Sequence, residues 1–297
     1  MVWNAKTNSL VFRIYPNYAC INSSRDIHSI FSICYFFHCT IFKILSAKEN
    51  LMSKESLPLK EKLESSKKYL QNADLKGADL AGADLKGALL GGANLHGANM
   101  NKIFLGDAQL SKANLTEANL EEANLNSADL NKANLKGANM HQLYARAADL
   151  RGANLSNANL TKSNLRQCSM FKSWMKNSDF SGANLQNIKG AQSQMQESKF
   201  CSAKLEGADL SGARMEGTDL KGAGLQAANL SRSVLKNSNL EGADLKGANL
   251  RYAIGLTAEQ IDSALIDKNT LLPNYLKVEW KSETEFKCHT SQQNSTY

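Results

Sequence analysis

One feature dominates this sequence: a five-residue frame that runs without insertion or deletion from Gln71 to Leu250. The frame contains 36 units, and position i, the centre of each unit counted from Leu75, is Leu in 26 units, Met in six and Phe in two. Ala145 and Gly190 are the two exceptions. Position i−2 is Ala 24 times, position i−1 is Asp or Asn 23 times, and position i+2 is Gly 14 times. Such regularity indicates a repeat architecture.

A period of five fits neither of the common secondary structures. In an α-helix, five residues turn the chain by about 500°, so successive central leucines would lie about 140° apart. In a straight strand, side chains alternate between faces, so residues five apart would point to opposite sides. The frame therefore predicts a backbone that turns a corner once per unit, with positions i and i−2 facing one axis.

The residues between the apolar positions suit tight turns. Asn, Asp and Gly tolerate unusual backbone angles, and Asn and Asp also form local hydrogen bonds. Small alanines beside large leucines are expected where the interior is narrow. Proline is absent from 71–250, which leaves every backbone N–H available for hydrogen bonds between coils. The sequence thus predicts an all-β solenoid with stacked leucines inside.

Two stretches in particular, ADLKGADLAGADLKG at 73–87 and ANLTEANLEEANL at 113–125, resemble the A(D/N)LXX motif of the pentapeptide-repeat family. The resemblance covers 180 of the 297 residues. It implies a right-handed quadrilateral β-helix with four units per coil. The 36 units would then form about nine coils, and the rod would be roughly 43 Å long at ~4.8 Å per coil. The resemblance also allows end-to-end dimers, whereas capped ends favour a monomer.

Both flanks of the repeat offer candidate helical caps, which cover the open ends of a solenoid. At the N-terminal side, Leu59, Leu63 and Tyr69 or Leu70 are expected to face inward. At the C-terminal side, Thr257 begins a capping-box pattern. The apolar residues that follow it at helical spacing are Ile261, Ala264 and Leu265. We divide the chain into an uncertain leader at 1–51, an N-terminal helical cap at 52–70, the repeat β-helix at 71–255, a C-terminal helical cap at 256–276 and a flexible tail at 277–297.

The first 51 residues leave three interpretations open. Residues 29–45 are mostly apolar and just long enough for a short membrane span. The leader is an extension that is not translated, with Met52 as the start, or a membrane anchor, or a buried structural segment. We predict a cytoplasmic protein, with membrane association through 29–45 as the alternative if residues 1–51 are present.

The sequence offers no catalytic constellation. Its five histidines lie far apart, and no nucleophile elbow, phosphate-binding loop, HExxH or dinucleotide motif occurs. The six cysteines form no CxxC pair and no metal-ligand spacing, which favours free thiols in a reducing compartment. We therefore predict that the protein is not an enzyme and has no catalytic residue, metal site or cofactor.

Net charge gives little support to nucleic acid as a partner. The chain carries +7, but residues 71–250 hold 20 basic and 17 acidic side chains. Nucleic-acid binding usually needs a concentrated basic face. We therefore rank nucleic acid last among the candidate partners.

Departures from the repeat consensus mark a candidate surface. At position i−1, Phe104, Tyr144 and Trp174 replace the usual Asp or Asn. A twenty-residue coil would place Phe104 and Tyr144 on one face, and it would stack Arg146 on Arg166.

Charge and aromatic side chains concentrate in the middle of the repeat. Between 141 and 190, seven basic residues stand against two acidic ones. Exposed aromatics with arginine are typical of interface hot spots. The candidate partner-binding residues are Tyr144, Arg146, Arg151, Arg166, Phe171, Lys172, Trp174 and Lys176.

Two interpretations of these residues stay open: a surface that binds a protein, or degenerate repeats in which aromatics cover an irregular coil. We predict a non-enzymatic scaffold or protein–protein interaction module with an unknown protein partner. One alternative, which the resemblance supplies, is a topoisomerase- or gyrase-protecting DNA mimic, which requires an acidic rod. The other is an exported or membrane-anchored, effector-like repeat protein.

Overall fold

The computed structural model of the chain describes residues 2–4, 9–11 and 58–290. The apolar segment at 29–45 and Met52 lie outside the described residues. No helix in the described part has the length and hydrophobicity needed to cross a bilayer. Near the start of the chain, β1 (Val2–Asn4) and β2 (Ser9–Val11) pair antiparallel.

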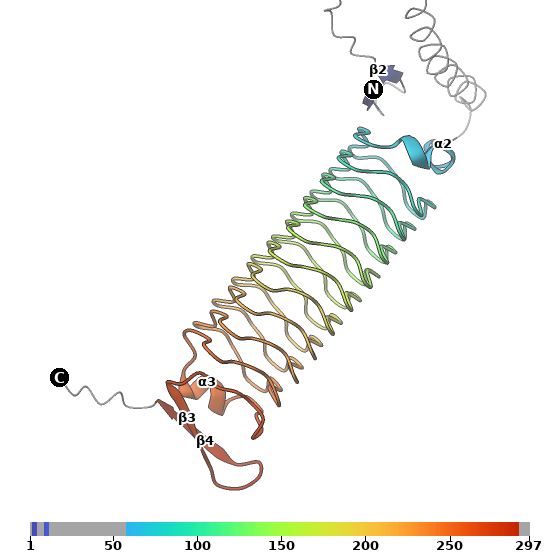
Figure 1. Cartoon of the computed structure of the whole chain (residues 1–297). Coiled ribbons are helices and arrows are strands. Elements are labelled where there is room, and N and C mark those ends of the chain that lie inside the picture. Colours follow the sequence, from blue (N-terminus) through green and yellow to red (C-terminus); the bar gives the residue numbers. More distant parts are fainter. Residues whose placement is uncertain (1, 5–8, 12–57, 291–297) are drawn as a thin grey trace, which may run out of the picture.

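The repeat region forms a long rod of stacked coils (Figure 1). Parallel bridges join residues twenty apart, from the pair Asp74 and Asn94 to the pair Val234 and Ile254. Each coil therefore contains four five-residue units, and the i−1 residues form four ladders along the rod. We number the ladders by their first residues: ladder 1 begins at Asp74, ladder 2 at Asp79, ladder 3 at Asp84 and ladder 4 at Leu89.

Backbone hydrogen bonds hold each unit and join it to the next coil. The amide of Leu75 donates to the carbonyl oxygen of Asn94 over 2.7 Å, and the amide of Asn94 donates to the carbonyl oxygen of Ala73 over 2.8 Å. Within the unit, the amide of Ala78 donates to the carbonyl oxygen of Leu75 over 3.1 Å, which closes a four-residue turn. Repetition of these bonds satisfies the backbone polar groups of a narrow rod without long strands.

Position i+2 has a left-handed backbone in every unit. Each fifth residue from Asn72 to Tyr252 has a φ between 54° and 69°, although only 14 of them are Gly. Because φ is positive only at the second central residue, the turn has the pattern of type II. This geometry explains the preference for Gly at i+2. The hydrogen bonds between coils hold residues such as Lys102 and Glu117 in the same conformation.

Positions i and i−2 fill the interior of the rod. Leu75, Leu155 and Leu250 are fully buried, and Phe180 and Phe200 stack on adjacent coils with ring centroids 4.8 Å apart. The two exceptions at position i are compensated at position i−2. Leu143 precedes Ala145 and Ile188 precedes Gly190, so a large residue moves to the position that is usually small. A Cβ on Gly190 would lie 3.0 Å from Leu210 Cδ2, which shows that no side chain fits there without rearrangement.

Helical segments lie at the N-terminal end of the rod (Figure 1). They are α2 (Leu59–Ser65) and the 3₁₀ turn η1 (Lys67–Tyr69). Leu63 and Leu70 are buried whereas Tyr69 is exposed, so Leu70 is the inward residue of that pair. The amide of Leu89 donates to the carbonyl oxygen of Lys67 over 2.8 Å, which joins η1 to ladder 4.

At the C-terminal end, the helix is shorter than the expected 256–276. It is α3 (Ala258–Asp262), and Thr257 and Gln260 form its capping box. Ile261 is buried as the helical spacing predicted, and Ala264 is buried too, although it lies beyond the end of α3. The expectation for Leu265 is corrected, because the chain leaves the helix first and Leu265, half exposed, pairs with Asp244 in ladder 3.

The expected flexible tail is corrected over 277–290. This segment contains most of an antiparallel hairpin of β3 (Leu276–Trp280) and β4 (Phe286–Thr290). Leu276 is buried and Val278 and Trp280 are half-buried, whereas the residues between them are exposed, which is the period of two of a half-covered strand. Trp280 packs on Phe286 with ring centroids 5.3 Å apart. Residues 291–297 lie outside the described residues.

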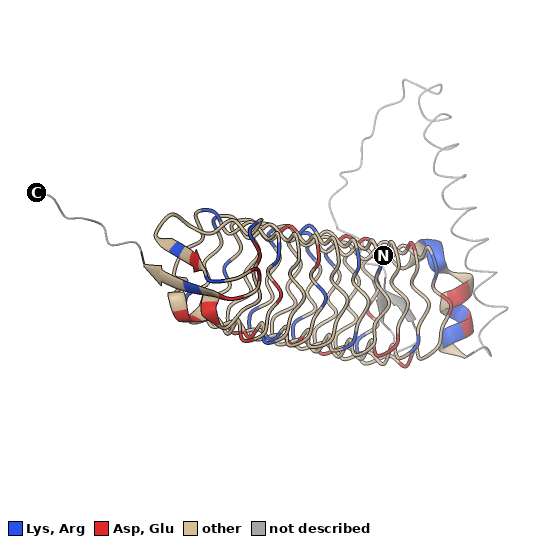
Figure 2. Cartoon of the chain, turned by 90° about the horizontal axis from the view of Figure 1, so that it is seen from below, with Lys and Arg blue, Asp and Glu red and all other residues tan. Residues whose placement is uncertain are grey.

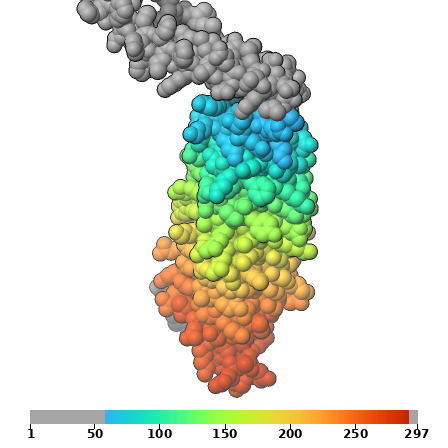
Figure 3. All heavy atoms as spheres, turned by 90° about the vertical axis from the view of Figure 1, so that its right-hand side faces the viewer, coloured from blue at the N-terminus to red at the C-terminus, as the bar shows by residue number. Residues whose placement is uncertain are grey.

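The colours of the space-filling view follow one another along the rod without mixing (Figure 3). Each coil therefore contacts mainly its sequence neighbours, as in other solenoids. Because positions i and i−2 fill the interior, the side chains on the outside of the described rod are the ones available to contact other molecules.

Candidate interaction surface

The register of the bridges divides the candidate residues into two groups. Tyr144 belongs to ladder 3, between Asn124 and Asn164, whereas Trp174 belongs to ladder 1. Because each coil passes through the four ladders in turn, ladders 1 and 3 lie on opposite sides of the rod. Tyr144 and Trp174 therefore do not form one patch.

The first group lies along ladder 3. Phe104 and Tyr144 share this ladder two coils apart, and the amide of Ala147 donates to the carbonyl oxygen of Arg166 over 2.9 Å. Arg146 and Arg166 thus occupy the same turn position in adjacent coils. Both of these placements confirm the prediction from a twenty-residue coil. Arg146 also donates from Nε and Nη2 to Gln167 Oε1, each over 3.4 Å.

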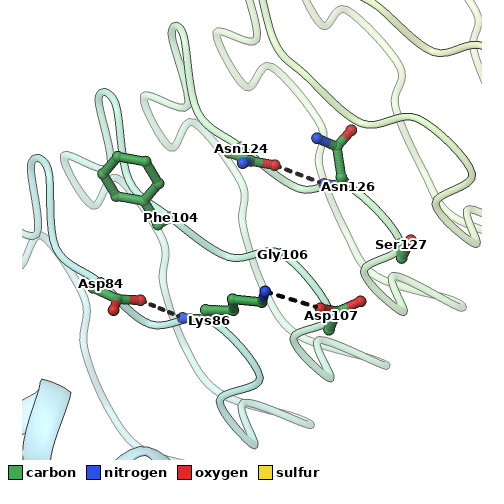
Figure 4. Close-up of a pocket in the computed structure, with 8 residues that line it drawn as sticks. All are labelled: Asp84, Lys86, Phe104, Gly106, Asp107, Asn124, Asn126 and Ser127. Carbon is green, nitrogen blue, oxygen red and sulfur yellow. Dashed lines mark hydrogen bonds and ion pairs between the residues drawn. The ribbon is translucent and has the colours of Figure 1, made fainter.

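A shallow hollow lies further along ladder 3 (Figure 4). Gly106, which lacks a side chain, leaves space beside the exposed ring of Phe104. Lys86 Nζ lies 3.8 Å from Asp107 Oδ2, and Asp84 Oδ1 accepts the amide of Lys86 over 3.0 Å. Asp84 Oδ1 also lies 3.1 Å from Lys67 Nζ, so each charged side chain that lines the hollow already has an ion-pair partner. Its lining residues are Asp84, Lys86, Phe104, Gly106, Asp107, Asn124, Asn126 and Ser127.

The second group lies on the other side of the rod. The amide of Gly152 donates to the carbonyl oxygen of Phe171 over 3.0 Å, so Arg151 and Phe171 occupy one turn position in adjacent coils. Lys172 Nζ stands 5.0 Å from the centroid of the Phe171 ring, a cation–π contact. Trp174 follows on ladder 1 and is 58% exposed. We call Arg151, Phe171, Lys172 and Trp174 the Trp174 cluster.

A carboxylate holds the guanidinium of Arg151. Arg151 Nε lies 2.8 Å from Asp149 Oδ1, and Nη2 lies 2.5 Å from Oδ2. The side-chain hydrogen bonds from Arg151 lower the pKa of Asp149, so this pair is ionised near neutral pH. The remaining candidate, Lys176, lies one turn beyond Trp174, between ladders 1 and 2.

Sequence reasoning missed a similar pairing nearer the C-terminal end. Arg232 Cζ stands 5.9 Å from the centroid of the Tyr252 ring, one coil away. Tyr252 and Ile254 are both more than half exposed. The signal that could have found them is the twenty-residue spacing between Arg232 and Tyr252.

The thiols in the described part of the chain are poorly suited to chemistry. Burial raises the pKa of Cys168 to about 12 and that of Cys288 to about 11. Burial and the hydrogen bond from Cys201 Sγ to Asp219 Oδ2 raise the pKa of Cys201. These thiols remain protonated near neutral pH and are weak nucleophiles. Among the described residues, no group of three or more His, Cys, Asp or Glu side chains could hold a metal ion.

The fold and the surface define a class of protein, a β-helical solenoid that presents fixed side chains along the outside of a rod. A family model for pentapeptide repeats matches the chain in eight copies, over residues 69–105, 105–142, 148–187, 193–232 and 228–254. Because the matched segments cover more than half of the chain, it belongs to the pentapeptide-repeat family.

Solved structures of other pentapeptide-repeat proteins are similar to this chain. HetL, involved in heterocyst differentiation regulation in the cyanobacterium Nostoc sp. strain PCC 7120, is 29% identical, with a TM-score of 0.32 over 67% of this chain and 87% of HetL. QnrB1, a plasmid-mediated fluoroquinolone resistance protein, is 16% identical, with a TM-score of 0.38 over 59% of this chain and 90% of QnrB1. A protein of the Arabidopsis thaliana thylakoid lumen is 19% identical, with a TM-score of 0.27 over 39% of this chain and 70% of its own. No curated protein matches at a significant level.

Proposed function

We propose that this chain is a non-enzymatic scaffold that binds a protein partner at the Trp174 cluster. The observation that carries the proposal is the exposed indole of Trp174 in a ladder whose four preceding members, from Asn94 to Asn154, are all Asn. Exposing so large an apolar ring to water is unfavourable, and Trp and Arg are enriched in the hot spots of interfaces.

The rigid coil supports this proposal. Hydrogen bonds to adjacent coils fix the backbone at Gly152, Lys172 and Trp174. Little backbone freedom is therefore lost when a partner binds, which favours affinity. The cluster also combines an indole, a phenyl ring and two cations, a mixture that can contact both apolar and acidic groups of a protein.

The finer architecture is part of the same proposal. We propose that the 36 units make about nine right-handed coils. At one end α2 and η1, and at the other α3 with the β3–β4 hairpin, act as caps. Ends covered in this way leave no open coil for end-to-end association, so the rod is proposed to be a monomer in the cytoplasm.

A DNA mimic is less well supported. It requires a row of carboxylates where phosphates would lie, but no ladder between 74 and 254 has more than three. Ladder 4 has Asp129, Asp149 and Asp209, with Lys189 among them. The likeness to QnrB1 concerns the fold alone. The exported or membrane-anchored alternative depends on residues 1–51 and stays a prediction.

Quantitative affinity purification from cells that express the chain tests the proposal. Trp174→Ala should reduce the partner recovered about tenfold, as expected for a hot-spot residue. Tyr144→Ala is the matched control, since Tyr144 is similarly exposed on the opposite side. Both variants should have the same melting temperature as the wild type. An equal loss in both variants, or no loss in either, would reject the Trp174 cluster as the binding site.

A further inference from the structure

The rod has four edges, each formed by the i+1 and i+2 residues between two consecutive ladders. The edge between ladders 4 and 1 includes Lys112 near one end and Arg251 near the other. Backbone hydrogen bonds join the turns of this edge. The amide of Lys132 donates to the carbonyl oxygen of Arg151 over 2.9 Å, and the amide of Arg232 donates to the carbonyl oxygen of Arg251 over 3.0 Å. Residues far apart in sequence thus form one continuous line.

Charge is distributed unequally among the four edges. Both signs occur along the whole rod in Figure 2, in keeping with its near-neutral total. The edge between ladders 4 and 1, however, has six cations and no acidic residue over the eight turns from 111–112 to 251–252. Over equivalent turns, each of the other three edges has three cations and two or three acidic residues. We call the first of these the basic edge, and its cations are Lys112, Lys132, Arg151, Lys172, Arg232 and Arg251.

The cations of the basic edge are also largely unpaired. Among the described residues, only Arg151 of the six has an ion-pair partner, Asp149. On the edge between ladders 2 and 3, by contrast, Lys102 and Lys221 lie 3.6 Å and 2.9 Å from glutamate oxygens. The basic edge therefore has positive charge that the chain itself does not neutralise.

The two ladders beside the basic edge differ. Ladder 4 carries Asp129, Asp149 and Asp209, whereas ladder 1 has no acidic residue from Asn94 to Ile254. Trp174 lies on ladder 1. An acidic ligand would therefore be attracted to the basic edge from the side of ladder 1, where Trp174 stands.

The dimensions fit an extended polypeptide. Seven coil steps separate Lys112 from Arg251, which is about 34 Å at ~4.8 Å per step. About ten residues of extended chain span this length at ~3.4 Å per residue. Alternate side chains of such a segment recur about every 6.8 Å, between the one-coil and two-coil spacings of the cations.

The aromatic rings favour carboxylates over nucleic acid bases. Lys172 already covers one face of Phe171, and Arg232 lies over Tyr252. Proteins that bind single strands stack bases on open aromatic faces. Carboxylates, by contrast, can pair with the cations of the basic edge without contacting an aromatic face, and Lys172 and Arg232 remain exposed.

We infer that the basic edge binds an extended acidic segment of a protein partner, with an apolar side chain of that segment on Trp174. This inference rests on the proposed function, because it names the chemistry of the partner bound at the Trp174 cluster.

The probe that tests it is a fluorescein-labelled peptide of six Glu-Ser repeats, titrated with the full chain at low salt. Lys112→Gln with Lys132→Gln, and Arg232→Gln with Arg251→Gln, remove charge at the two ends while leaving Trp174 intact. Gln already occupies the left-handed turn position at Gln192, so it suits the backbone of the i+2 sites. The matched control is Lys136→Gln with Lys236→Gln, on the edge between ladders 1 and 2 where glutamates balance the lysines.

Each end variant should weaken peptide binding about fivefold, the effect of two exposed ion pairs, and the control should not. Raising the salt concentration should weaken wild-type binding. Equal weakening in the control, or none in the end variants, overturns the inference. Tighter, edge-dependent binding of a twelve-nucleotide thymidine strand would assign the edge to nucleic acid instead and also overturn it.

The outcomes separate this inference from the proposed function. If Trp174→Ala removes the partner while the end variants bind the peptide normally, the cluster stands and the basic edge is rejected. If the end variants lose the peptide while Trp174→Ala recovers the partner normally, the proposed site is rejected instead.

Discussion

The side-chain amide of Asn94 donates a hydrogen bond to Oδ1 of Asp74, one coil earlier, over 2.8 Å. The same oxygen accepts the backbone amide of Lys76 over 3.4 Å. Asn114 then donates to Asn94 over 3.1 Å, so both of these side-chain amides donate toward the N-terminal end. An Asp can begin such a series because its carboxylate accepts, but it cannot continue one because it has no donor. This difference accounts for Asp at the start of ladder 1 and Asn at the two positions that follow it.

The first prediction tests this series of side-chain hydrogen bonds. Asn114→Asp removes the donor to Asn94 but keeps the acceptor for the amide of Thr116. It should lower the free energy of unfolding by about 1 kcal/mol in urea denaturation. Asn134→Asp is the matched control, because the Asn134 side chain accepts the amide of Lys136 but makes no hydrogen bond to a neighbouring coil within the described residues. Equal losses would show that charge, and not the lost donor, sets the stability.

The second prediction concerns the buried leucine stack. Leu155 is fully buried, so Leu155→Lys places an ammonium group in an apolar interior. The variant should therefore lose the cooperative unfolding transition that circular dichroism measures. Leu155→Met should cost less than about 1.5 kcal/mol, because Met has nearly the same volume. Wild-type melting of Leu155→Lys would contradict the buried position of the stack.

The third prediction tests the exchange of volume between Leu143 and Ala145, both buried. Leu143→Ala leaves a cavity and should destabilise the fold by about 2–5 kcal/mol. Ala145→Leu alone should overpack the interior and lower the free energy of unfolding by about 1–3 kcal/mol. The double variant restores the consensus order of small and large residues, so it should be more stable than either single variant. Additive losses in denaturation would mean that the two side chains do not share one space.

The fourth prediction is a pH dependence from Cys168. Its thiol donates to the carbonyl oxygen of Ala145 over 2.8 Å, and burial raises its pKa to about 12. In the unfolded chain the thiol ionises near pH ~8.5. The folded state therefore keeps a proton that the unfolded state releases. The stability from this group is complete below the unfolded pKa and is lost as the pH rises toward the folded value.

Between about pH 9 and 11, wild-type stability should thus fall more steeply than that of Cys168→Ala, by about 1.4 kcal/mol per pH unit. Alanine suits the site, since it occupies position i−2 in 24 of 36 units. The lysines, tyrosines and remaining thiols titrate in both proteins, so the difference isolates Cys168. Parallel stability curves would mean that the Cys168 thiol is free to ionise in the folded rod.

Much of the interior could be read from the sequence, because a five-residue period admits few structures. The period predicts that Leu75 and Ala73 face inward and that Asp74 faces out, and all three do. The exposed aromatics Tyr144 and Trp174 were also predicted, but their placement on opposite sides was missed. That placement follows from the four units per coil that the resemblance implied, because the thirty residues between Tyr144 and Trp174 make one and a half coils.

The features that were missed are those in which the relevant spacing is not five. Leu276 and Val278 follow a period of two, but the polar residues around them made the segment resemble a tail. Lys112 and Arg251 share an edge only when the chain is stacked in steps of twenty residues. The near-neutral charge of the repeat conceals that alignment, because the acidic residues lie on the other edges and on the ladders.

In the proposed complex, a protein partner binds on the side of Trp174 through an acidic segment. Photo-crosslinking tests it most directly, with benzoylphenylalanine placed at Phe171 and, as the matched aromatic control, at Phe104 on ladder 3. The crosslinked peptide is then identified by mass spectrometry in cells that express the chain. We expect one partner peptide rich in Asp and Glu from position 171 and none from position 104. Equal crosslinking from both positions, or a peptide without acidic residues at position 171, would show that no acidic segment binds at the Trp174 cluster.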